Sequence, residues 1–229
     1  MTGNIGLQLT VAMLLGLTHT LLIALLVPAG SRGRGIRIAI LAGHWALQTA
    51  FRYFEQMEGW GAYLLMAALY GAELLCFRLR SGRPWAAVFQ RCLCFFLITE
   101  TCTLVFSHLS MKFLGADLLR SEPVGRMAIA FAVLLGVLYL LLRGVFSLFP
   151  AENGRISHTT ALGFISAVPF LFVRHITFWV PVTAEEVPAA MMLTIVMACV
   201  VSVAMNVCLE RLMFTMEEKR RAEQQRHMA

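Results

Sequence analysis

Apolar positions along this chain gather into runs of about 20 residues, separated by short segments rich in Gly, Pro or Arg. A helix of that length crosses a bilayer, whereas the strands of an outer-membrane barrel would alternate polar and apolar residues. The pattern therefore predicts an all-α fold, a polytopic transmembrane bundle of seven helices. The expected ranges are Ile5–Val27, Arg37–Met57, Trp60–Phe77, Pro84–Leu109, Val124–Phe149, His158–Val180 and Ala189–Phe214.

The last apolar run contains no Gly or Pro that would end it, and it passes directly into a charged segment. An unbroken helix from Pro188 to Ala229 would be roughly 60 Å long, about twice the hydrocarbon thickness. We therefore divide the chain into a transmembrane domain, residues 1–214, and the start of a cytoplasmic signalling helix, residues 215–229. A helix of this kind couples an event in the membrane to a partner beyond it.

Positive residues are distributed unevenly among the connecting segments. The first, third and fifth connections and the tail are rich in Arg, while the second and sixth carry Glu. Loops rich in Lys and Arg stay in the cytoplasm, so we expect the N-terminus outside and the C-terminus inside. These loops also explain the net charge of +6, so no nucleic-acid partner is implied, and a composition that is 59% hydrophobic excludes a soluble globular protein.

Ionisable side chains within the predicted spans are costly and mark candidate functional sites. Counting about 1.5 Å per residue from the span ends places some of them in an outer layer. This layer and the residues above it are Arg52, Glu55, Glu100, Arg174, His175 and Trp179. Two interpretations stay open: a cavity that binds an extracellular ligand, or an ion-pair cluster that locks helix packing.

An inner layer contains His19, His44, Glu73 and Arg91. We interpret it as a structural or gating latch rather than a ligand or metal site, because these residues lie on separate helices without metal-binding spacing. No metal or cofactor is therefore expected. The chain also lacks HExxH, GxSxG and Walker-type glycine motifs, so no catalytic residue is assigned.

The tail begins with a short apolar seam. Leu209, Leu212 and Met216 have the three-and-four spacing of coiled-coil a and d positions, and Lys219 and Glu223 interrupt it. The seam predicts a parallel homodimer along these three residues. A single solvated charged helix is the alternative, because pairs such as Glu217 and Arg221 stabilise an isolated helix.

Beyond the seam the tail reads Glu210-Arg211-Leu212, then Glu217-Glu218-Lys219-Arg220-Arg221-Ala222-Glu223-Gln224-Gln225. With seven spans and an outside N-terminus, the chain resembles the membrane sensor region of GHKL-type sensor histidine kinases of Gram-positive bacteria. That family includes the receptors for peptide pheromones in quorum sensing.

The resemblance implies an input module in the bacterial cytoplasmic membrane. Such a module would detect an extracellular small molecule or peptide and signal through its last helix to a cytoplasmic kinase and response regulator. The kinase domain is not within these residues, and His227 lacks the neighbours of the family's phosphoacceptor, so that role is not transferred.

Two other classes remain open. A small transporter could use Glu73 and Glu100 as proton or cation carriers, although only Pro169 suggests a helix broken near mid-membrane. An intramembrane enzyme would need a nucleophile, base or metal set at one depth, and no convincing set is present.

Overall fold

The computed structural model describes residues 5–31, 33–54, 60–83, 85–120, 124–149 and 189–228, and within these ranges it is helical without strands. Four helices are long and apolar enough to cross a membrane: α1, α4, α5 and α7. The all-helical class and the membrane character are thus confirmed. The predicted spans Arg37–Met57 and Trp60–Phe77 fall on α2 and α3, which are not among these four helices, and the predicted span His158–Val180 lies outside the described residues. The seven-span count therefore stays a prediction. The elements are α1 (Ile5–Leu26), α2 (Arg34–Tyr53), α3 (Trp60–Ser81), α4 (Trp85–Leu114), the short 3₁₀ helix η1 (Leu118–Arg120), α5 (Val124–Leu148) and α7 (Ala189–Met228).

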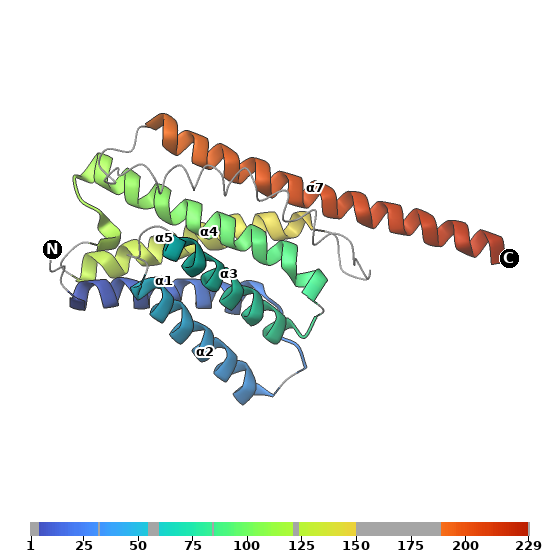
Figure 1. Ribbon diagram of the computed structural model, residues 1–229, viewed down its shortest axis with the longest axis horizontal. Helices are drawn as coiled ribbons and strands as arrows, with labels where there is room; N and C mark the ends of the chain where they lie inside the picture. The colour runs from blue at the N-terminus through green and yellow to red at the C-terminus, as the bar shows by residue number, and fades with distance from the viewer. Residues whose placement is uncertain are drawn as a thin grey trace.

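The helices form one bundle from which α7 projects (Figure 1). Helix α1 packs against α2 and α5, and α4 contacts α3, α5 and α7. Helix α2 crosses α1 at an angle, while α7 runs beside α4 and continues past the end of the bundle (Figure 1). Among the described helices, α4 therefore makes the most extensive contact with α7.

Helix α2 turns its polar face inward. His44, Gln48 and Arg52 are spaced by four residues, so they share one face, and all three are buried. On the outward side, Ile38 and Leu47 are exposed. This arrangement reverses the polarity of a helix on a water-soluble protein, and it suits a helix that lines a polar interior and faces lipid.

An apolar core fills the space between α1, α4, α5 and α7. Leu22, Phe95, Leu138 and Ile195 are almost completely buried within it. Apolar side chains also cover the outside of the bundle, where a water-soluble protein would carry charges. On α1 they recur every fourth residue and form one exposed stripe: Leu9, Met13, Leu17, Leu21 and Leu25. A surface of this kind supports contact with lipid.

Helices α1 and α2 approach each other closely at Gly16. A Cβ atom on Gly16 would lie 3.0 Å from Thr49 Oγ1, 3.2 Å from the Thr49 backbone nitrogen and 3.3 Å from Gln48 Cβ. Small residues let helix backbones come together in membranes, where packing rather than water drives association. Gly16 therefore sets the separation at which the polar face of α2 meets α1.

Arginine side chains close the helix ends on the Arg-rich side of the bundle. Arg80 of α3 donates hydrogen bonds to the carbonyl oxygens of Ala24 (2.7 Å) and Val27 (2.8 Å), at the end of α1. Arg211 of α7 donates one to the carbonyl of Leu148 (2.7 Å), at the end of α5. The last carbonyls of a helix lack partners within the helix, so these contacts satisfy them.

Helix α7 is continuous over 40 residues, from Ala189 to Met228. At 1.5 Å per residue it is about 60 Å long, as the missing Gly and Pro led us to expect. Its first half is packed against the bundle, and most side chains beyond Glu210 are exposed. The prediction of one helix that runs from the apolar region into the charged tail is confirmed.

We expect Gly16→Val to destabilise the bundle by about 1–3 kcal/mol, because the added atoms would collide with the α2 backbone. The free energy of unfolding can be measured by titrating SDS into mixed micelles. Gly43→Val is the matched control, since a Cβ atom on Gly43 of α2 meets nothing within 4 Å. Equal stability of the two variants would contradict the close approach.

Candidate functional site

A buried ion pair joins α2 to α4. The Arg52 Nη2 atom donates to the Glu100 Oε1 atom, and the two side chains are 2% and 8% exposed. The same Nη2 atom lies 3.2 Å from His19 Nε2 on α1. Arg52 thus contacts groups on two neighbouring helices at once. Arg52 and Glu100, which the sequence analysis placed together in the outer layer, therefore form an ion pair.

His19 also connects the ion pair to α3, through its other ring nitrogen. Its Nδ1 atom lies 2.5 Å from Glu73 Oε1, and both side chains are fully buried. A guanidinium can only donate hydrogen bonds, so His19 Nε2 accepts from Arg52 and the ring proton sits on Nδ1. His19 therefore donates to Glu73 as a neutral imidazole.

A second arm leads from Glu73 back to α1. Gln48 Nε2 lies 3.4 Å from both Glu73 Oε1 and His44 Nε2, and 3.3 Å from the Leu69 carbonyl. His44 Nδ1 lies 2.8 Å from Thr20 Oγ1, whose own proton is donated to the Gly16 carbonyl at 2.8 Å. Thr20 must therefore accept from His44, which leaves His44 Nε2 to accept from Gln48.

These contacts form one directed network, which we call the polar network: His19, Thr20, His44, Gln48, Arg52, Glu73 and Glu100. It touches α1, α2, α3 and α4. Buried polar groups that are fully hydrogen-bonded fix one arrangement of the helices around them. Within the described residues, Glu73 Oε2 and Gln48 Oε1 are buried acceptor atoms without a hydrogen-bond partner. A proton on Glu73 Oε2 would make the network neutral, with only Arg52 and Glu100 charged.

The two layers expected from the sequence are not separate in the structure. Arg52, which pairs with Glu100 of the outer layer, also contacts His19 of the inner layer, because Arg52 has a long side chain and α2 crosses α1 at an angle (Figure 1). Residues counted from helix ends therefore do not share a depth when the helices are tilted.

Arg91, placed in the inner layer by the sequence, lies apart from the polar network. Its guanidinium stacks 5.5 Å from the centre of the Phe149 ring, and it interacts electrostatically with Glu210 on α7. Arg91 precedes Glu100 by about two and a half helical turns, so the two side chains leave α4 on opposite faces. Counting depth gives no information about which face a residue occupies.

Four of the six residues expected to bind a ligand lie outside the described residues: Glu55, Arg174, His175 and Trp179. The outer cavity therefore stays a prediction, and only Arg52 and Glu100 are placed. Of the seam residues on α7, Leu212 and Met216 are each 57% exposed and Leu209 is half-buried.

The sequence analysis missed a second buried polar stripe. Ser202, Asn206 and Glu210 are spaced by four residues on α7, and all three are buried. Gln48 and Thr20 of the polar network were missed as well. Uncharged polar residues at helical spacing within an apolar run would have been the signal, on α7 as on α2.

Three or more His, Cys, Asp or Glu side chains do not gather in metal-binding geometry anywhere in the part of the chain that the structure describes. In the polar network, both ring nitrogens of each histidine already face hydrogen-bond partners. The polar network can therefore bind or release a proton at the Glu73 carboxylate, and it holds α1, α2, α3 and α4 together.

The ion pair can be tested by a double-mutant cycle. Arg52→Gln and Glu100→Gln should each cost about 3–5 kcal/mol of unfolding free energy, since each leaves a buried charge without its partner. The double variant should cost clearly less than the sum of the two. Arg143→Gln, at an exposed arginine of α5, is the control and should change little. Additive single losses would show that the two side chains are not coupled.

Comparison with known proteins gave no match: no protein-family model, no curated protein and no solved structure is significantly similar to this chain.

Proposed function

We propose that the chain is the membrane sensor module of a signalling receptor. It would detect an extracellular small molecule or peptide and pass a change in helix packing through α7 to a cytoplasmic histidine kinase and its response regulator. The membrane would be the bacterial cytoplasmic membrane. The observation that carries this proposal is the 40-residue α7 helix, which is packed on the bundle at one end and projects from it at the other.

A route from the polar network to α7 runs through α4. Glu100 of α4 belongs to the polar network, and the same helix also packs against α7. There, Cys199 Sγ donates to the Leu97 carbonyl at 3.5 Å, and Glu210 interacts with Arg91. A ligand that competes for Arg52 or Glu100 would release α4 from α2 and change its contact with α7.

A parallel homodimer suits the exposed part of α7. Leu212 and Met216 are apolar, exposed and one helical turn apart, and they lie beyond the part of α7 that packs on the bundle. Two copies paired along this face would bury both side chains and place two kinase domains together. A small rotation of α7 would then change the register of the pair.

A proton- or cation-coupled transporter is the second candidate. It is favoured by Glu73 Oε2 and Gln48 Oε1, two buried acceptors without a hydrogen-bond partner within the described residues. A proton or a small cation could bind there and leave again. A transporter would not require the long α7 helix, so we prefer the sensor.

The orientation can be tested by single-cysteine labelling. Ser31 follows α1 and Ala116 follows α4, and both positions are exposed at opposite ends of the bundle. In a cysteine-free background, we expect Ser31→Cys to be protected from an impermeant external reagent and Ala116→Cys to react. The positive charge near Ser31 is the physical reason. Labelling of Ser31→Cys with protection of Ala116→Cys would show that the predicted orientation is wrong.

Signal transmission can be tested by disulfide crosslinking in membranes. All six native cysteines are free thiols, so replacing them breaks no disulfide. Single cysteines at Leu212 and Met216 should crosslink two copies, and weaker crosslinking is expected at the half-buried Leu209. Cysteines at Arg211 and Glu218, on other faces of α7, should crosslink little. Equal crosslinking efficiency on every face of α7 would contradict a dimer paired along Leu212 and Met216.

Whether the polar network controls the pairing of α7 can be tested with a variant that changes the network but keeps the fold. Glu73→Gln retains the oxygen that accepts from His19 but removes the carboxylate charge. We expect it to change the crosslinking efficiency at Leu212 severalfold, because the packing of α1 to α4 would shift. The control is Glu223→Gln in the exposed tail. Unchanged crosslinking in Glu73→Gln, with the dimer intact, would contradict signalling through α7 and favour the transporter.

A further inference from the structure

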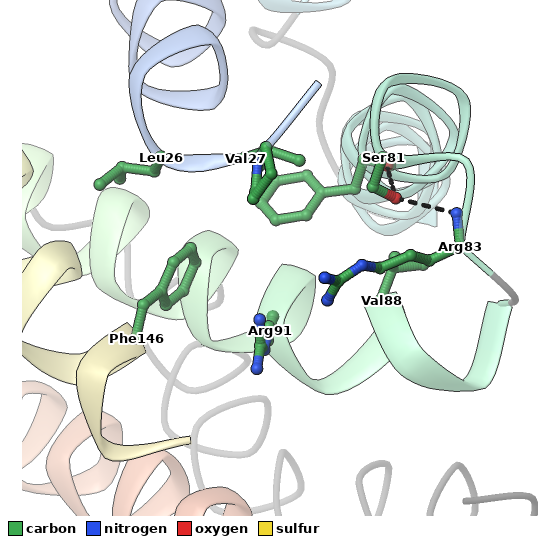
Figure 2. Close-up of a pocket in the computed structure, with 9 residues that line it drawn as sticks. Leu26, Val27, Ser81, Arg83, Val88, Arg91 and Phe146 are labelled. Atoms are coloured by element: carbon green, nitrogen blue, oxygen red, sulfur yellow. Dashed lines mark hydrogen bonds between the residues drawn. The ribbon is translucent and has the colours of Figure 1, made fainter. Parts of the chain in front are cut away.

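A small pocket of about 30 Å³ opens at the Arg-rich end of the bundle, between α1, α3, α4 and α5 (Figure 2). Apolar side chains form most of its wall: Leu26, Phe77, Val88 and Phe146. Two arginines complete it, Arg83 from the connection between α3 and α4, and Arg91 from α4. None of the residues of the polar network lines this pocket, and Arg91 leaves α4 on the face opposite to Glu100.

Both arginines direct positive charge at this pocket. Figure 2 shows the Arg83 side chain reaching back along α4 toward Arg91. The two guanidinium groups are near enough to repel each other, and Glu210 on α7 is the carboxylate that offsets Arg91. Two further arginines lie at the same end, Arg78 over the Trp85 ring and Arg80 at the end of α1. The local potential therefore favours an anion.

The dimensions of the pocket restrict the ligand. A volume of about 30 Å³ holds roughly two or three water-sized groups, such as the oxygen atoms of one phosphate. A nucleotide base, a sugar ring or a long peptide side chain would not fit inside the pocket. Guanidinium groups bind phosphate oxygens through pairs of parallel hydrogen bonds, so Arg83 and Arg91 suit this anion.

The surroundings of the pocket point to a lipid. It lies where α1 and α5 end and α4 begins, three helices that are long and apolar enough to span a membrane. The end of a spanning helix is at the depth of the lipid headgroups. The apolar wall beside the arginines would contact the glycerol and the upper acyl carbons. Basic pockets between transmembrane helices are a known form of site for anionic headgroups.

We propose that this pocket binds the phosphate of an anionic phospholipid between Arg83 and Arg91. The bound lipid would bridge the connection between α3 and α4 to the ends of α1 and α5. It would also relieve the repulsion between the two arginines. This proposal is independent of the sensor function, since any membrane protein with this pocket could hold the lipid.

Native mass spectrometry of the full chain in detergent tests the proposal, with phosphatidylglycerol and phosphatidylcholine as probes. We expect phosphatidylglycerol to bind the wild type in preference to phosphatidylcholine. Arg83→Gln should weaken that binding by about 10- to 100-fold, the loss of one hydrogen-bonded charge, and Arg83→Lys should weaken it less. Arg83 is the residue to change, because Arg91 also stacks on Phe149 and its loss would disturb the packing.

The matched control is Arg143→Gln, which removes the same charge from an exposed site near the end of α5 that does not line the pocket. It should retain wild-type affinity for phosphatidylglycerol. Equal losses in Arg143→Gln and Arg83→Gln would mean diffuse surface attraction and would overturn the site. Binding of inorganic phosphate without uptake of phosphatidylglycerol, measured as a shift in thermal stability in phosphatidylcholine nanodiscs, would overturn the lipid assignment.

Discussion

A guanidinium buried in an apolar bundle must be neutralised and hydrogen-bonded where it lies, and this requirement organises α1 to α4. Arg52 meets it with Glu100 on one side and His19 on the other. Because His19 then has to donate through Nδ1, Glu73 of α3 is drawn into the same network. Four helices are thus held in one relative arrangement by a chain of polar contacts, and the close approach at Gly16 brings α1 and α2 near enough to complete it.

Helix α4 carries this arrangement to the rest of the molecule. One face holds Glu100 in the polar network, and the opposite face holds Arg91, which meets Phe149 after α5 and Glu210 of α7. A rotation of α4 would therefore move both charged sites at the same time. Helix α7 packs on α4, and two polar residues of α7, Ser202 and Asn206, are buried within the apolar part of that helix.

Much of the fold was predictable because span length and breaker residues are local properties. The range of α1 and the uninterrupted α7 followed from apolar runs and from the absence of Gly and Pro. The three-dimensional site was predictable only in part. Sequence alone identified Arg52, Glu100, His19 and Glu73 as costly charges that need partners, but depth counting separated them and added Arg91. Helix tilt and the direction of each side chain around its axis decide such contacts, and neither is a local property.

The polar network also constrains what any function of this molecule can be. Both histidines are oriented as neutral rings, so its formal charge depends on Glu73: it is neutral with a proton on Oε2 and negative without one. A negative network in an apolar interior is costly unless a cation, a proton or a positively charged ligand group compensates it. Transport would therefore begin with such a compensating event, whereas the proposed sensing route would begin when a ligand competes for Arg52 or Glu100. They differ in whether the bound charge moves on across the membrane or shifts α4 against α7, and the long α7 helix is a structure that only the second outcome uses.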